Sequence, residues 1–255
     1  MQKAVIVVLI LFYSVHFNAQ DKLTKAHQET ITEFIGFFKN NDRHKIAANV
    51  SYPLKREYPL PEIKSKVEFL DRFNEVFDSK LINTIVNSNP LKEDDWSAVG
   101  WRGIMLGNGD LWLDYDGTLL AINYQSAQEV KKSAELIASE KKTLHPSVNK
   151  FYKPIAVLNT KKFRIRIDDL GQGRYRYASW SKSAKISDKP DLIIENGEFS
   201  PDGSGGNHHY TFKNGKFIYE CGIVVIGEEN SSPAYLTIYK SGKEILSESA
   251  DLVQY

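Results

Sequence analysis

The stretch WRGIMLGNGDLWLDYDGTLLAIN, residues 101–123, alternates apolar and polar side chains and contains two dipeptides that are typical of tight turns. Asn108-Gly109 and Asp116-Gly117 supply the positive φ angles that two-residue hairpin loops require. The pattern therefore predicts a meander of three antiparallel strands. These strands cover residues 101–106, 110–115 and 118–123.

Upstream of the meander, apolar residues recur at the spacing of a helix. The first such stripe consists of Ile31, Phe34, Ile35 and Phe38. Asp42 is suited to cap a second, short helix, and three prolines between residues 53 and 61 predict an extended link. Ser65 and Glu68 form a capping box before a third, longer helix whose apolar stripe reaches Ile85.

Downstream of the meander, the chain first returns to a helical pattern and then becomes rich in short strands. A charged amphipathic helix is predicted over about residues 127–144, and His145-Pro146 ends it. Six strand-like runs separated by glycine-containing turns then predict a small sandwich or open barrel, of which we favour the sandwich. The runs span residues 163–168, 175–180, 192–196, 209–212, 217–226 and 235–239.

Three helices that precede a twisted antiparallel sheet are the order found in the NTF2-like (SnoaL-like, cystatin-related) α+β cone. The residues that carry the resemblance are IAANVSYPL at 46–54, EFLDRF at 68–73 and GWRGIMLGNGDLW at 100–112. Over about residues 22–125 the chain resembles a group of exported bacterial proteins with this cone. The superfamily includes isomerases, dehydratases, polyketide cyclases and binding modules, so the resemblance implies a fold and a pocket between sheet and helices rather than one activity. The second half resembles no family.

The chain is expected to be exported. Lys3 precedes an apolar run from Ala4 to Tyr13, which is too short to span a bilayer but fits a signal peptide cleaved after Ala19. The only cysteine, Cys221, is far from that site, so a lipoprotein is not expected. The product would be secreted or periplasmic; a buried N-terminal helix or a membrane anchor is the alternative interpretation of this run.

These patterns together predict an α+β protein in four parts. The parts are a signal peptide (residues 1–19), an NTF2-like cone of helices and a curved antiparallel sheet (20–125), a helical linker (126–146) and an all-β, sandwich-like domain (147–255).

The overall charge excludes some partners. The chain has 33 lysines and arginines against 32 aspartates and glutamates, so binding to nucleic acid by bulk charge is not expected. Counting by region gives −2 for residues 20–142 and +2 for residues 145–255, and neither value is large enough to select a partner. No later stretch is apolar enough to predict a membrane span, and no motif predicts a metal or a cofactor.

The middle strand of the meander offers a candidate base. Asp110, Trp112 and Asp114 share one face of the sheet because side chains alternate along a strand. On a concave face, Asp110 could act as a general base whose pKa is raised by desolvation beside Trp112. On a convex face, the same residues would be solvated carboxylates beside an exposed indole.

Two further sets of residues could bind a ligand. Arginines beside aromatic rings suit a carboxylate or a sugar, and such a polar mouth is predicted from Tyr52, Arg56, Trp101 and Arg102. A second set would form a guanidinium stripe across two adjacent strands, because it alternates with aromatic and apolar residues: Arg164, Arg166, Arg174 and Arg176. Alternatively, the aromatic residues of the first set belong to the core, and the arginines of the second set lie on a sheet face that meets only solvent.

The sequence favours a non-catalytic binding protein over an enzyme. No nucleophile–base motif is present, and the glycine-rich stretch 203–206 lacks the lysine and hydroxyl residue of a phosphate loop. We expect a polar ligand, a glycan or a peptide, or another envelope component. Two alternatives stay open: a small-molecule enzyme that uses Asp110 as its base, and a homodimeric protein-interaction module.

Overall fold

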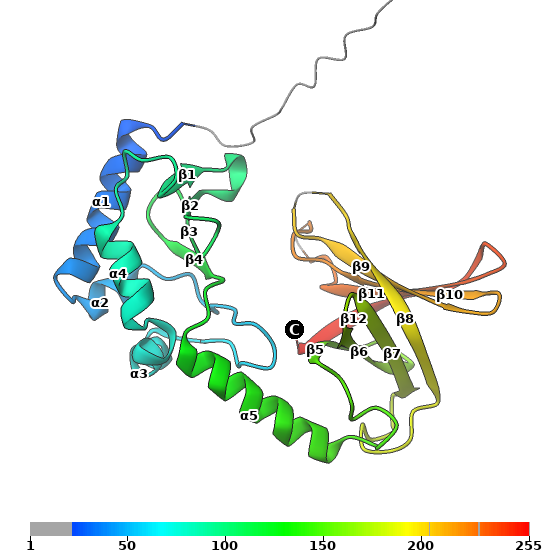
Figure 1. Cartoon of the computed structure of the whole chain (residues 1–255). Coiled ribbons are helices and arrows are strands. Elements are labelled where there is room, and N and C mark those ends of the chain that lie inside the picture. Colours follow the sequence, from blue (N-terminus) through cyan, green and yellow to red (C-terminus); the bar gives the residue numbers. More distant parts are fainter. Residues whose placement is uncertain (1–21, 204, 229, 255) are drawn as a thin grey trace, which may run out of the picture. The chain divides into compact units, whose positions relative to one another are not determined.

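A computed structural model describes residues 22–203, 205–228 and 230–254 (Figure 1). The predicted signal peptide, residues 1–19, lies outside the described residues. These residues divide into two compact units. The first unit contains residues 22–51 and 79–124, and the second contains residues 52–78 and 125–254.

The first unit combines helices with one small sheet. Its elements are α1 (Lys25–Lys39), α2 (Arg43–Ala48), α4 (Ser79–Asn87), β1 (Trp96–Ala98), the 3-10 helix η1 (Gly100–Arg102), β2 (Ile104–Leu106), β3 (Leu111–Leu113) and β4 (Leu119–Ile122). The predicted apolar stripe of α1 is buried, with Ile31 fully enclosed and Phe34 packed edge-on against Trp96. The side chain of Asp42 caps α2 by accepting a hydrogen bond from the amide of Lys45, as predicted.

The predicted meander is present, but its strands are shorter than expected. Strands β2, β3 and β4 pair antiparallel in that order, and Gly109 and Gly117 take positive φ angles of 96° and 91° at the two turns. Strand β1 adds a fourth, unpredicted strand at one edge, and residues 101 and 102 lie in η1 rather than in a strand.

The predicted NTF2-like cone is wrong. All strands of the first unit contain only three or four residues, which is too short for a sheet that curves around a pocket. The predicted third helix is also two helices. Phe77 adopts an extended conformation after α3 (Lys66–Val76), so α3 belongs to the second unit and α4 to the first.

The second unit is built on a closed antiparallel barrel of eight strands (Figure 1). The strands are β5 (Lys153–Asn159), β6 (Phe163–Gly171), β7 (Arg174–Ser181), β8 (Leu192–Pro201), β9 (His208–Asn214), β10 (Phe217–Ile223), β11 (Ala234–Lys240) and β12 (Lys243–Gln254). Each strand pairs with the next along the chain, and β12 pairs with β5 to close the ring. The predicted β-sandwich is therefore wrong, because the sequence pattern did not reveal β5 and β12, the two strands that join its ends.

The barrel interior is filled by side chains that alternate along the strands. Ile165 and Ile167 of β6 face Tyr177, Phe212 and other rings of the facing strands within one apolar cluster. Cys221 is fully buried in the same cluster, and burial raises the pKa of its thiol.

A second apolar cluster covers part of the outer face of the barrel. Leu144, Val148 and Phe151, from the segment that follows helix α5 (Ala127–Thr143), pack on Ala178 and Trp180 of β7. One stretch of the outer barrel wall is thus buried under chain. No helix among the described residues is long and apolar enough to cross a membrane.

Candidate functional site

The four predicted arginines lie on neighbouring strands, but they do not form an exposed stripe. Strands β6 and β7 pair with Arg166 opposite Ala178 and Asp168 opposite Arg176. Arg174 is exposed, and Arg164 is half-buried. Arg166 and Arg176 are buried, at 0% and 2% exposure, because helix α5 and the loop after it cover this part of the wall.

The two buried arginines belong to a charge-balanced network. Arg166 donates to Glu140 Oε1 of α5 (2.6 Å) and to Asp168 Oδ1 (2.7 Å), and Arg176 donates to Asp168 Oδ2 (2.6 Å). Burial would lower the pKa of Arg166, but Asp168 and Glu140 outweigh it and raise that pKa. Tyr58 donates to Glu140 Oε1 (2.5 Å), and burial together with this carboxylate raises the pKa of Tyr58. Two positive and two negative side chains thus neutralise each other beneath α5.

Arg176 also positions the loop of residues 146–152. Its Nη2 donates to the carbonyl of Val148 (2.5 Å), and its Nη1 donates to the carbonyl of Lys150 (3.0 Å). The Nε of Arg176 is buried and finds no acceptor among the described residues. A buried donor without an acceptor costs about 1–3 kcal/mol, so this nitrogen is a group that an added acceptor would stabilise.

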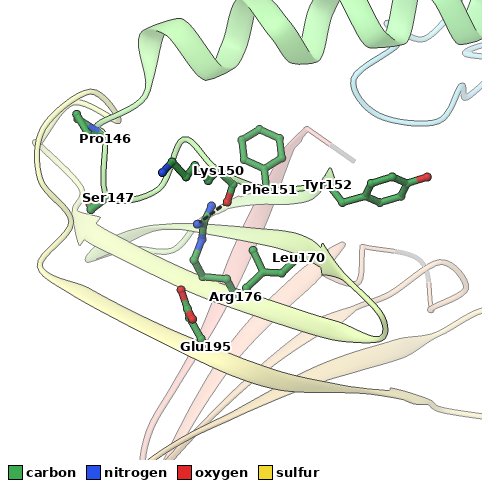
Figure 2. A pocket seen from close by; sticks show the side chains of 8 residues that line it. All are labelled: Pro146, Ser147, Lys150, Phe151, Tyr152, Leu170, Arg176 and Glu195. Carbon is green, nitrogen blue, oxygen red and sulfur yellow. Dashed lines mark hydrogen bonds between the residues drawn. The ribbon is translucent and has the colours of Figure 1, made fainter.

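A shallow hollow of about 510 Å³ lies between this loop and the outer wall of the barrel (Figure 2). Its lining residues are Pro146, Ser147, Lys150, Phe151, Tyr152, Leu170, Arg176 and Glu195. Arg176 and Glu195 extend from neighbouring strands β7 and β8 toward the loop, as Figure 2 shows. Lys150, Tyr152 and Glu195 are exposed, so the hollow offers a cation, an anion and an aromatic ring to solvent. Its volume lies in the range of small-molecule sites.

A serine and a histidine meet at the edge of this hollow. His145 Nδ1 lies 2.8 Å from Ser147 Oγ, which is the distance expected of a nucleophile and its base. The same Nδ1 also accepts the backbone N–H of Ser147 (3.2 Å), so the imidazole closes a local turn. Among the described residues no carboxylate hydrogen bonds to this ring to orient it, which favours a structural role for the pair.

The predicted polar mouth is divided between the two units. Arg56 forms a fully buried, two-point ion pair with Glu129 of α5, with bonds of 2.8 and 2.5 Å. Tyr52 packs against the ring of Phe69, and burial raises its pKa to about 12. In the first unit, Trp101 is 68% exposed on η1, and Arg102 lies over its ring at 5.7 Å.

The structure does not bury the predicted base. Asp110 is exposed at the turn between β2 and β3, whereas a base with a pKa raised by desolvation would have to be enclosed. Trp112 folds back over that turn, and its Nε1 donates to the carbonyl of Gly109 (3.1 Å). No group of three or more histidines, cysteines or carboxylates among the described residues could hold a metal ion.

Sequence reasoning missed Lys150, Tyr152 and Glu195 as members of one site. Glu195 interrupts the apolar run 192–194 and was a visible signal, since a carboxylate there must face outward when its neighbour Ile194 faces the core. The loop residues gave no signal, because their position depends on the carbonyl contacts of Arg176.

Comparisons with protein-family models, with curated proteins and with solved structures found no match to this chain.

Proposed function

We propose that this protein binds a polar ligand without transforming it, and that the ligand occupies the hollow on the outer barrel wall. The proposal rests on the surroundings of Arg176. This residue is 2% exposed and lines the hollow, and its Nε has no hydrogen-bond acceptor among the described residues. A ligand carbonyl, carboxylate or hydroxyl oxygen that displaces the loop atoms enclosing this nitrogen would supply the missing acceptor. Two loop carbonyls and the carboxylate of Asp168 already fix the guanidinium, so the donor is pre-organised.

The other lining residues indicate what kind of ligand fits. Lys150 offers further donors, whereas Glu195 accepts, so the ligand should carry both acceptors and donors. Tyr152 is 73% exposed and, with Leu170, offers a flat apolar surface. A sugar unit combines hydroxyl groups with an apolar ring face, so we favour a glycan, with a peptide as the second ligand class.

Binding to a glycan array tests this proposal, with Glu195→Gln as the informative variant. Glu195 is exposed, so the substitution should leave the fold intact while weakening binding about tenfold or more, the value of a hydrogen bond to a charged group. Glu198→Gln, which changes an exposed carboxylate of the same strand outside the hollow, is the matched control. Equal binding by wild type and Glu195→Gln would contradict the placement of the site.

The non-catalytic part of the proposal has its own test. A fluorophosphonate probe reacts with serines that a base activates. We expect Ser147 to stay unlabelled, because its contact with His145 closes a turn. Labelling that disappears in Ser147→Ala would show an activated nucleophile and would replace the binding proposal with a hydrolase.

A further inference from the structure

Lysines cluster in the turns at one end of the barrel. In an antiparallel barrel of consecutive strands, the turns after β5, β7, β9 and β11 lie at the same end. We call residues 160–162, 182–191, 213–216 and 240–243 the lysine end. These segments contain nine lysines, no arginine and only two carboxylates. The lysines are Lys161, Lys162, Lys182, Lys185, Lys189, Lys213, Lys216, Lys240 and Lys243.

Contacts between the turns confirm that the segments are neighbours. Lys182 donates to the carbonyl of Thr160 (2.9 Å), which joins the first two segments. The amide of Ser241 donates to the carbonyl of Lys216 (2.8 Å), which joins the last two. The lysine end therefore consists of two joined pairs of turns, and we call its residues together the rim.

The positive charge of this rim is largely uncompensated. All nine lysines are exposed. Only Lys162 and Lys213 form ion pairs with carboxylates among the described residues, with Glu248 (3.2 Å) and Glu198 (3.5 Å). The two carboxylates of the rim instead accept hydrogen bonds from backbone amides: Asp188 from the amide of Lys185, and Asp191 from the amide of Ser181.

The opposite end has a different composition. Its connections, residues 172–173, 202–207 and 224–233, contain no lysine or arginine and three carboxylates, and among the described residues the only cations at the strand ends beside them are Lys153 and Arg174. The barrel is thus electrically polarised along its axis, although residues 145–255 carry a net charge of only +2. A polarised domain approaches a charged partner with one end foremost.

We propose that the lysine end docks on the surface of an anionic lipid bilayer. Nine exposed lysines, six of them with no side-chain hydrogen bond or ion pair among the described residues, suit a broad array of negative headgroups. Recognition of one defined phosphate group favours arginine forks, which the rim lacks. Ile245, which follows the rim and is 52% exposed, can enter the headgroup layer. A nucleic acid fits less well, because the rim residues include no arginine, and the ring of the adjoining Phe217 is partly buried and covered by Lys240 rather than open for base stacking. This site is separate from the hollow.

Vesicle co-sedimentation tests the proposal on residues 20–255, the chain without the predicted signal peptide. Vesicles of equal parts phosphatidylcholine and phosphatidylglycerol should bind the protein at low salt, and vesicles of phosphatidylcholine alone should not. Each lysine near such a surface raises the binding constant about fivefold, and the attraction is screened over about 10 Å at 0.1 M salt. Binding should therefore fall steeply as salt is added.

Two variants with the same change in charge locate the surface. In the first, five rim lysines without ion pairs among the described residues become glutamine: Lys161, Lys185, Lys189, Lys216 and Lys243. In the second, five exposed lysines outside the rim become glutamine: Lys39, Lys66, Lys92, Lys131 and Lys142. We expect at least about a tenfold loss of vesicle binding for the first variant and less than about twofold for the second.

Three outcomes would overturn the proposal. They are equal binding to neutral and anionic vesicles, equal losses in the two variants, and tighter binding to a single-stranded oligonucleotide than to the anionic vesicles. Circular dichroism of both variants shows whether the barrel is intact, and exposed Lys→Gln changes are expected to preserve it.

Discussion

At the scale of single residues, Gly197 shows how tightly the barrel is packed. A Cβ at this position would lie 2.2 Å from Cε1 of Phe212, whose ring is fully buried. We expect Gly197→Ala to lower the free energy of unfolding by about 1–3 kcal/mol, because the ring must leave its position in a filled core. Urea unfolding followed by near-ultraviolet circular dichroism measures the change.

Gly36→Ala is the matched control for that substitution. Gly36 lies in α1, and a Cβ there meets no atom within 4 Å. Alanine should stabilise that helix by up to about 1 kcal/mol. If Gly197→Ala were as well tolerated as Gly36→Ala, the proposed contact between β8 and β9 inside the barrel would be wrong.

Single residues also show what sequence patterns can and cannot reveal. The alternating pattern correctly placed Arg166 and Arg176 on one face of the sheet and their apolar neighbours in sequence on the other, because side chains on a strand alternate between two faces. It could not reveal whether the arginine face meets water or protein. That depends on Glu140 and the loop carbonyls, which reach the wall through the packing of α5.

At the scale of elements, Glu75 joins α3 to α5 and makes their contact sensitive to pH. Burial alone would raise its pKa, but Lys132 and Arg72 outweigh burial and lower it. Because the folded pKa lies below the unfolded value of about 4.3, the stabilisation is fully present above that value and is lost as pH falls through the folded pKa.

Glu75→Gln should therefore destabilise the protein by about 1 kcal/mol at pH 7, and the difference from wild type should disappear in acid. Urea unfolding at a series of pH values measures it. Glu135→Gln is the control, since Glu135 meets Lys131 only at 4.0 Å on the exposed face of α5. A pH-independent effect of Glu75→Gln would rule out the ion pairs as the cause.

Elements also differ in how well their local sequences predict them. The stripe of α1, the cap of α2 and the turns at Gly109 and Gly117 are local signals, and all three were predicted correctly. The pairing of β12 with β5 joins the two ends of the barrel and has no local signal. Pro154 in β5 and the polar stretch 247–249 in β12 also weaken the usual strand pattern.

At the scale of the whole molecule, net charge conceals how charge is distributed. The sums for each half of the chain are close to zero and predicted no partner. The barrel topology then gathers turns that are far apart in sequence, and with them nine lysines, at one end. The antiparallel order of consecutive strands is thus what gathers the positive charge of a nearly neutral sequence at one end of this domain.

The division of the chain into two units leads to a last prediction. The barrel unit includes residues 52–78 from the N-terminal half of the chain. Within this unit Arg56 forms an ion pair with Glu129, Tyr58 donates a hydrogen bond to Glu140, and the carbonyl of Glu75 accepts one from Ser126. A chain of residues 125–255 alone would lose these three contacts and expose the side of α5 that residues 52–78 cover, with the carboxylate of Glu129. Each hydrogen bond contributes about 1 kcal/mol and the lost apolar burial adds to it, so the loss is a large part of the stability of a typical domain.

A shortened chain in which a glycine–serine linker replaces residues 79–124 keeps all three contacts. We expect it to melt as the barrel of the full chain does, and residues 125–255 alone to melt about 10 °C lower or to fail to fold. Thermal unfolding followed by circular dichroism compares the two. If they melt together, residues 52–78 contribute nothing to the barrel, and the buried pair of Arg56 and Glu129 does not hold α5 as the structure has it.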